Sequence, residues 1–175
     1  MRVLIVGTSA SGKTTLGRKL SKKLDIPYTD LDDLFWLDNW VERDRQDFLS
    51  RAQIITNQRS WIMTGNYSRI IKDIYSKLDL LIWLDYPLYI MLWRGLKRSL
   101  QRAIFKTPCC NNNQESFLRL FSSKSIIWWI LTSHKRRTKT YQKLLETNPF
   151  HNMRIVRLKS QKETDEWLRS LSISL

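Results

Sequence analysis

The chain has few of the residues that crosslink a fold or bind a structural metal. Its 175 residues include only two cysteines and two histidines. Cys109 and Cys110 are adjacent, so they do not suit a long-range disulfide. No ligand spacing joins them to His134 and His151, so a zinc site is not indicated either. We expect two reduced thiols in a loop.

Long apolar runs are also absent. The Trp-rich run 126–131 is the nearest candidate, and it is far shorter than the roughly 20 apolar residues that span a bilayer. Residues 1–6 lead straight into a glycine-rich loop, without the cleavable apolar segment of a secretory signal. We therefore expect a cytoplasmic protein with no membrane partner. The length and the 42% hydrophobic content suit one core, hence a single domain over 1–175.

Acidic residues are scarce relative to basic ones. The chain has 16 Asp and Glu against 30 Lys and Arg, which gives a formal net charge of +14. Residues 94–143 contain 12 of the basic residues and one acid, Glu115. Such a block is suited to bind anions, either the phosphates of a nucleotide and its acceptor or the backbone of a nucleic acid.

Glycine is rare, yet three of the five glycines fall between Gly7 and Gly17. Residues 7–14 read G-T-S-A-S-G-K-T, in which two glycines with four residues between them precede a lysine and a hydroxyl side chain. This pattern predicts a loop whose N–H groups hold the phosphates of ATP, with Lys13 neutralising charge and Thr14 placing its hydroxyl on Mg²⁺. The expected phosphate-binding residues are Gly7, Thr8, Ser9, Ala10, Ser11, Gly12, Lys13, Thr14 and Thr15.

Apolar runs at 3–6, 26–29, 61–63, 80–84 and 153–158 alternate with helical stretches at 14–24, 43–58, 67–77 and 88–105. This alternation predicts an α/β fold in three layers, with a five-stranded parallel sheet covered on both faces. Ser160 and Glu163 form a capping box that begins a last helix. A basic, lid-like insertion at 94–146 is broken at 107–113, and its helical stretch 114–146 has a polar interruption near 132–134. We expect a mobile cover over the phosphates.

Carboxylates follow two of the expected strands, at the edge where ligands bind in such sheets. Asp30, Asp32 and Asp33 follow the second strand, where a carboxylate can hold Mg²⁺ through water or accept a proton from an acceptor hydroxyl. Capping of the next helix is the alternative for each of them, and Asp32 is the favoured functional residue. Asp85 ends the fourth strand and is open to the same two interpretations.

The third strand is followed by Gly65 and Asn66, with Arg69 shortly after. Glycine lets a ligand approach the backbone, and the amide and guanidinium can bind a polar or anionic acceptor; a plain turn is the alternative. Several tryptophans near this site or in the insertion could stack on a base, although packing is the simpler assumption. These are Trp36, Trp40, Trp93, Trp128 and Trp129.

Five arginines of the insertion are candidate phosphate ligands. Arg94, Arg98 and Arg102 recur every four residues and share one helix face, where like charges are unfavourable unless an anion lies opposite. Arg136 and Arg137 form a second cluster. We expect Arg98, Arg136 and Arg137 to stabilise the transferred phosphoryl group, with a solvated helix face as the alternative.

The chain resembles the adenylate-kinase-related P-loop kinase family known as DNA topology modulation proteins. The resemblance covers nearly all of it and rests on V-L-I-V-G-T-S-A-S-G-K-T-T-L, D-L-D-D-L-F-W-L-D-N-W-V-E-R, W-I-M-T-G-N-Y-S and I-W-L-D-Y-P with L-W-R-G-L-K-R-S-L. It implies a nucleoside-monophosphate-kinase-like P-loop NTPase fold. By this resemblance Arg94 packs on the adenine of ATP, Arg98 begins the lid, and Lys159 and Ser160 border the adenine. Family members tend to read I-D-G-N-Y where this chain has Thr64, so Asp32 would have to hold the metal-bound water.

Together these features predict a kinase that uses ATP and Mg²⁺ to phosphorylate a small acceptor, a nucleotide or another small hydroxyl or phosphate compound. Asp32, Gly65, Asn66 and Arg69 would meet the acceptor. The alternative is an ATP-binding regulator that contacts nucleic acid through Arg136 and Arg137, with an affinity that falls steeply with salt. No helix-turn-helix or zinc-finger pattern supports that alternative. The sequence identifies neither the acceptor nor the oligomeric state.

Overall fold

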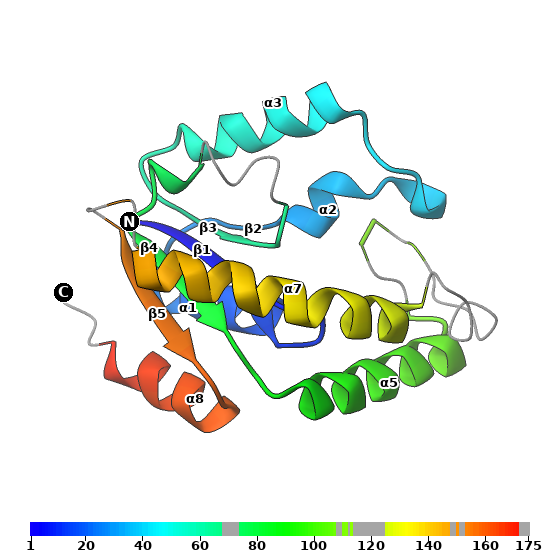
Figure 1. Ribbon diagram of the computed structural model, residues 1–175. Helices are drawn as coiled ribbons and strands as arrows, with labels where there is room; N and C mark the ends of the chain where they lie inside the picture. Colours follow the sequence, from blue (N-terminus) through cyan, green and yellow to red (C-terminus); the bar gives the residue numbers. More distant parts are fainter. Residues whose placement is uncertain are drawn as a thin grey trace.

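A parallel five-stranded sheet with strand order β2-β3-β1-β4-β5 organises the chain (Figure 1). The computed structural model describes residues 1–67, 74–107, 110, 111, 113, 125–147, 150 and 153–171. The strands are β1 (Arg2–Gly7), β2 (Tyr28–Asp30), β3 (Trp61–Thr64), β4 (Leu80–Leu84) and β5 (Arg154–Leu158). The helices are α1 (Lys13–Leu24), α2 (Leu31–Phe35), η1 (Asp38–Trp40), α3 (Arg45–Thr56), α5 (Leu88–Phe105), α7 (Ile126–Thr147) and α8 (Gln161–Ser170).

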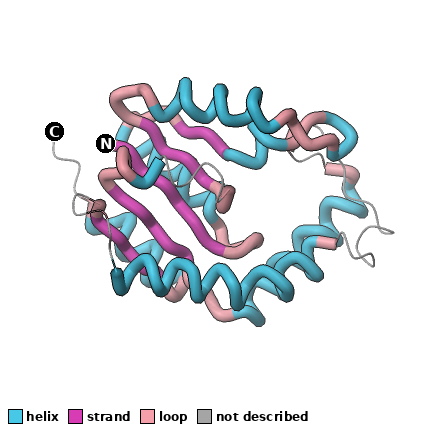
Figure 2. The backbone as a smooth tube through the Cα atoms, turned by 45° about the horizontal axis from the view of Figure 1, so that its top comes forward, coloured by secondary structure: helices cyan, strands magenta, loops and turns pink. Residues whose placement is uncertain are grey.

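Buried side chains on both faces of the sheet explain why the strands read as continuous apolar runs. Val3 and Ile5 of β1 are fully buried on the face covered by α1, whereas Leu4 and Val6 are buried on the opposite face, in a cluster with Tyr141 of α7. Figure 2 shows the strands lying between helices. The predicted α/β class and the parallel five-stranded sheet are therefore confirmed.

Helix α7 departs from the prediction because it runs without a break through residues 132–134. The Thr132 hydroxyl donates to the Trp128 carbonyl at 2.8 Å, and the Ser133 hydroxyl donates to the Trp129 carbonyl at 2.5 Å. These bonds satisfy the polar side chains within the helix, so they do not interrupt it. Most of the helix expected at 67–77, and residues 114–124 of the insertion, lie outside the described residues.

The two described helices of the insertion are packed into the fold. Figure 1 shows α5 and α7 side by side, and Gly95 of α5 lies against α7. A Cβ on Gly95 would lie 2.8 Å from Cδ1 of Ile130. Ile130 and Tyr141 of α7 are buried in the two core clusters. Helix α7 is thus a core element, and a mobile cover stays a prediction.

The expectations about a membrane-spanning helix and about the cysteines can be compared with the described part of the chain. Within it, no helix is both long and apolar enough to cross a bilayer. Cys110 forms no disulfide among the described residues, and Cys109 lies outside them.

Candidate active site

The loop between β1 and α1 lies at the carboxyl end of the central strand. Gly7 has φ 148° and Gly12 has φ 95°, conformations that L side chains rarely adopt. A Cβ on Gly7 would also lie 2.6 Å from the Leu84 carbonyl oxygen. Ala10 adopts φ 63° in the same turn. The loop therefore curves tightly into the start of α1, as the glycine spacing predicted.

Lys13 folds its side chain back onto this loop. Its Nζ donates to the carbonyl oxygens of Gly7 at 3.0 Å and Thr8 at 3.1 Å. Burial lowers the pKa of Lys13 from 10.5 to about 8; Asp32 and Asp30 oppose that shift. Arg137 and Arg98 add to it by charge repulsion. An anion bound at the loop would raise the pKa of Lys13 again, because it would pair with the ammonium.

Asp30 is the carboxylate that reaches Thr14. The Thr14 hydroxyl donates to Asp30 Oδ2 at 2.8 Å, and the Tyr28 hydroxyl donates to the same oxygen at 3.1 Å. Tyr28 also shares a 2.9 Å hydrogen bond with the Thr64 hydroxyl. The other Asp30 oxygen accepts from the Asp32 N–H at 3.1 Å and caps α2. The sequence left open which aspartate caps the next helix, and the structure shows that it is Asp30. Asp30 is also the carboxylate beside Thr14.

A hydroxyl and a carboxylate at this position fit Mg²⁺, which prefers oxygen ligands and keeps several of its waters. Among the described residues, no group of three or more His, Cys, Asp or Glu side chains could hold a metal ion, so an all-protein metal cage is not present there. This donor set is consistent with a metal ion held partly by the phosphates of a ligand.

Asp32 is half-buried in the cavity wall and accepts a 2.6 Å hydrogen bond from the Tyr67 hydroxyl. Burial raises the pKa of Asp32, and the neighbouring Asp30 raises it further. Tyr67, Lys13 and Arg137 act in the opposite direction. A carboxylate with a raised pKa is a better proton acceptor than an ordinary aspartate, so the environment suits a general base.

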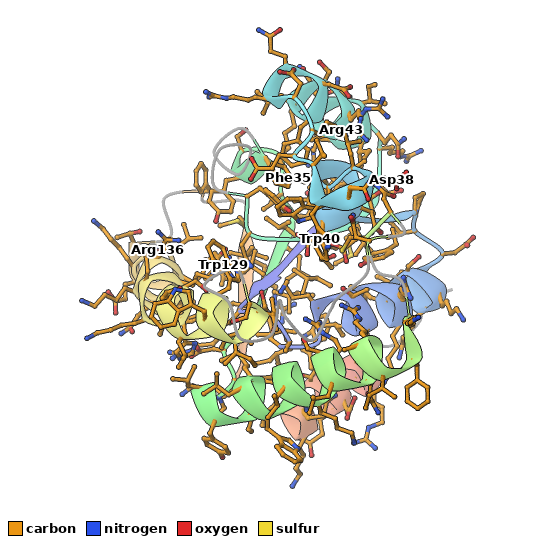
Figure 3. The ribbon with its side chains drawn as sticks, turned by 90° about the vertical axis from the view of Figure 1, so that its right-hand side faces the viewer. Phe35, Asp38, Trp40, Arg43, Trp129 and Arg136 are labelled. Atoms are coloured by element: carbon orange, nitrogen blue, oxygen red, sulfur yellow. The ribbon has the colours of Figure 1, made fainter. Side chains whose placement is uncertain are left out.

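These groups line one large cavity of about 2160 Å³, together with arginines from the insertion. Figure 3 shows Trp129 and Arg136 of α7 on one side, opposite Phe35 and Trp40 on the other. The cavity brings together most of the predicted residues, from the loop, the second strand and both helices of the insertion. Those from the insertion are Arg94, Arg98, Arg102, Arg136 and Arg137.

Two of these arginines have defined partners near the loop. Arg94 lies over the Tyr86 ring, 5.3 Å from its centroid, and its Nη2 donates to Gln161 Oε1 at 3.3 Å. Arg137 lies over the Trp129 ring at 5.2 Å. Burial lowers the pKa of Arg137, and its buried Nη1 has no hydrogen-bond partner in the described structure. Arg137 therefore presents an unsatisfied donor in the cavity wall.

Asn66 lines the cavity, and it is also hydrogen-bonded to the phosphate loop. Its Oδ1 accepts from the Gly7 N–H at 3.1 Å, and its Nδ2 donates to the Gly7 carbonyl at 2.7 Å. The Tyr141 hydroxyl also donates to Asn66 Oδ1, at 2.9 Å. These bonds anchor the start of the phosphate loop, so the amide is largely occupied. Gly65 does line the cavity, and Arg69 lies outside the described residues.

The segment after β5 reaches the cavity through α8, and the expected contact of Lys159 and Ser160 with adenine stays a prediction. Ser160 caps α8 by accepting from the Glu163 N–H at 3.1 Å, which confirms the capping box. Neither Lys159 nor Ser160 lines the cavity; Gln161 and Thr164 do. The first turn of α8 therefore lines the cavity.

Asp85 neither caps α5 nor joins the cavity. It pairs with Arg157 of β5, whose Nη2 is 2.6 Å from Asp85 Oδ2. The cap position of α5 is Pro87, which has no side-chain hydrogen bond. The metal-site interpretation of Asp85 therefore has no support from the geometry.

The sequence did not indicate the contacts that three residues, His134, Asn111 and Asn113, make at the site. His134 Nδ1 lies 3.3 Å from the Thr8 hydroxyl, so α7 contacts the phosphate loop directly. Asn111 Nδ2 donates to the Asp33 carbonyl at 2.7 Å and to the Trp36 carbonyl at 2.6 Å. Asn113 Nδ2 donates to the carbonyl of Leu37 at 2.8 Å. The asparagine-rich break was a signal for such amide bonds, but not for their partners.

Five aromatic rings in contact with one another line one end of the cavity. Phe35 contacts Trp36, Phe48 and Tyr67 at centroid distances of 4.9, 5.3 and 4.9 Å. Trp36 also contacts Trp40 at 5.6 Å. All five rings line the cavity. This end is suited to a ligand with a flat or apolar body.

Comparison with known proteins agrees with this geometry. A family model described as an AAA domain matches residues 3–99. The uncharacterized protein YqaC of Bacillus subtilis (strain 168) is 32% identical over 102 residues, which cover 56% of each chain. The chain thus spans about half the length of that curated relative.

Two solved structures share the fold over nearly the whole chain. Shikimate kinase from Acinetobacter baumannii, in complex with shikimate, superposes with a TM-score of 0.60 at 15% identity, over 96% of this chain and 88% of that one. Deoxyadenosine kinase from M. mycoides superposes with a TM-score of 0.54 at 14% identity, over 98% of each chain. At these identities the likeness shows a small-molecule-kinase-like P-loop fold.

Proposed function

The chain belongs to the AAA domain family, and on that premise we propose that it transfers the γ-phosphoryl group of ATP to a small acceptor. One observation carries the proposal. The loop lysine, the Thr14 and Asp30 pair, Asp32 and arginines of two insertion helices all line the same cavity. Phosphoryl transfer needs these elements, since it depends on positioning and charge stabilisation.

Each group has a role that follows from its position. The loop from Gly7 to Thr15 and Lys13 hold the donor phosphates. Thr14 and Asp30 would hold Mg²⁺, which supplies positive charge next to the phosphates when bound. Arg94 would stack on the adenine base, next to Tyr86 and Gln161, which line the same part of the cavity.

Chemistry on the acceptor is assigned to Asp32. Its raised pKa and its place between Lys13 and Arg137 support a general base that takes the proton of the acceptor hydroxyl. Arg98, Arg136 and Arg137 would stabilise negative charge on the transferred group. The unsatisfied Nη1 of Arg137 supports this role most directly.

The acceptor end combines aromatic rings with cations. Arg43 is held there by Asp47, with 2.6 Å between its Nη1 and the carboxylate, while Trp40 and Trp129 lie on opposite sides. These features favour an anionic acceptor with a flat body, and a nucleotide is one such compound. The two kinases with known structures leave the choice open, since one is bound to shikimate and the other to dCMP and dCDP.

The nucleic-acid regulator and the cytoplasmic location stay predictions. The regulator would need Arg136 and Arg137 on an outer surface. Arg136 is exposed, but both arginines line the cavity, and Arg137 is half-buried there. This placement favours the kinase over the regulator.

A paired substitution tests the kinase. A thermal-shift screen of nucleotides and small hydroxyl compounds with Mg²⁺ first identifies ligands, because bound ligands raise the apparent stability. With the acceptor so found, Asp32→Asn should lower the rate of phosphoryl transfer by about 10²- to 10⁴-fold, the usual contribution of a general base, while ATP still binds. The matched control is Asp38→Asn, because Asp38 is an exposed aspartate that does not line the cavity. Equal rates for wild type and Asp32→Asn would refute the assignment.

A further inference from the structure

Helix α5 carries an exposed apolar stripe on the side away from the cavity. It consists of Tyr89, Trp93, Leu96, Leu100 and Ile104, whose exposed fractions run from 37% at Leu100 to 71% at Tyr89. Five large apolar side chains in a row on one helix differ from the scattered exposed residues that ordinary surfaces carry. The stripe therefore needs an explanation other than the core.

The other faces of α5 are already used. Arg94, Arg98 and Arg102 line the cavity, while Gly95 and Ser99 are buried on the side that packs against α7. Because the helix advances 100° per residue, the stripe occupies a third, separate face. Nothing in the proposed kinase chemistry requires it.

The spacing of the stripe identifies the kind of partner. From Tyr89 the intervals are four, three and four residues, through Trp93 and Leu96 to Leu100. This alternation is the seam of a helix that packs along another helix, since it keeps the apolar side chains on one narrow line. A bilayer surface would instead favour a broad apolar face.

We propose that the stripe pairs with its own copy across a two-fold axis, forming a homodimer through α5. The area is sufficient. At about 200 Å² for a large side chain, the exposed fractions amount to roughly 550 Å² per copy, or ~1,100 Å² for the pair, which passes the ~1,000 Å² of a specific interface. Trp128 and Leu131 of α7, exposed at 54% and 45%, offer further apolar area on the adjoining helix.

Charge gives this dimer a signature that separates it from other partners. Each copy has a formal net charge of +14, and the exposed Lys97 lies beside the stripe. Like charges oppose the association of two copies, so added salt should strengthen the dimer by screening them. An anionic partner, whether a nucleic acid or an acidic lipid surface, would show the opposite dependence.

Sedimentation velocity of the full chain at 50 mM and 500 mM NaCl tests the proposal. The wild type should sediment as a dimer, with a smaller dissociation constant at the higher salt. The double variant Trp93→Gln/Leu96→Gln should weaken the dimer by at least 100-fold. The matched control Ile54→Gln should not, because Ile54 is 66% exposed on α3, on a different part of the surface.

Folding of the double variant is checked by its circular dichroism spectrum, which depends neither on the dimer nor on ATP. A monomeric wild type at 100 μM and high salt overturns the proposal, and so does a double variant that dimerises like the wild type. Vesicle or DNA capture at low salt by a monomeric wild type overturns it in favour of the anionic partner. None of these results bears on phosphoryl transfer, so the two proposals fail separately.

Discussion

The pKa of Lys13 predicts how nucleotide affinity changes with pH. In the free protein, burial lowers this pKa to about 8. Bound phosphates pair with the ammonium and should return its pKa toward 10.5 or above, so binding takes up a proton when Lys13 is neutral. The affinity for the nucleotide is therefore highest well below pH 8, and it declines as the pH rises through that value.

The magnitude follows from the fraction of Lys13 that is protonated. With a free pKa of about 8, that fraction falls from roughly nine-tenths at pH 7 to about one-tenth at pH 9. The dissociation constant of a non-hydrolysable ATP analogue should rise about tenfold over this range, equal to about 1.4 kcal/mol. Isothermal titration calorimetry at constant ionic strength measures it.

The control is Lys13→Arg, whose guanidinium stays charged over the whole range, so its affinity should not change between pH 7 and 9. The stability of the free protein should change in the other direction. Between pH 8 and 10 the unfolded chain holds more protons on Lys13 than the folded chain, so this group makes unfolding less favourable as the pH rises. A flat wild-type affinity from pH 7 to 9, or an equal decline in Lys13→Arg, would show that the reasoning is wrong.

Four further substitutions test the packing around the site. Gly17→Ala places a Cβ 2.4 Å from Cε2 of Tyr28, so urea denaturation should show a net loss of about 1–2 kcal/mol despite the better helix propensity of alanine; a more stable variant would contradict the packing. Thr64→Asp puts a carboxylate at a site that is only 1% exposed, so its melting temperature should fall and transfer should not accelerate; faster transfer would mean that Thr64 limits catalysis. Tyr141→Phe removes one buried hydrogen bond and should lower the free energy of unfolding by about 1 kcal/mol. Asn66→Ala also removes the partner of the Gly7 N–H and carbonyl, so it should lower that free energy by about 2–3 kcal/mol and weaken ATP binding. Equal losses in urea denaturation would show that Asn66 does not hold the loop.

Features formed by neighbouring residues were readable from the sequence. The loop at 7–14, the capping box of Ser160 with Glu163 and the helix at Leu88–Phe105 were predicted with the bounds or partners that the structure has. In each case a few consecutive residues decide the backbone conformation. The alternation of apolar runs with helices likewise determined the parallel sheet, because buried parallel strands need both faces covered.

Pairings between distant segments were decided only by the tertiary structure. Asp30 and Asp32 follow the same strand, and the sequence favoured Asp32 for the metal. The register of β2 on β3 places Asp30 opposite Thr64 and within reach of Thr14, which leaves Asp32 toward Tyr67. Such an outcome depends on how strands align, which no single segment encodes.

Arg157 and Asn66 illustrate the same limit. The pairing of β4 with β5 brings Arg157 to Asp85, which removes that aspartate from the site, and the packing of α7 brings Tyr141 to Asn66, which fixes the phosphate loop. The sequence by itself determined that this chain has a phosphate-binding α/β fold with basic helices after the fourth strand. The tertiary structure alone decided which carboxylate and which arginines share the cavity, because a side chain's partner depends on elements that fold next to it from elsewhere in the chain.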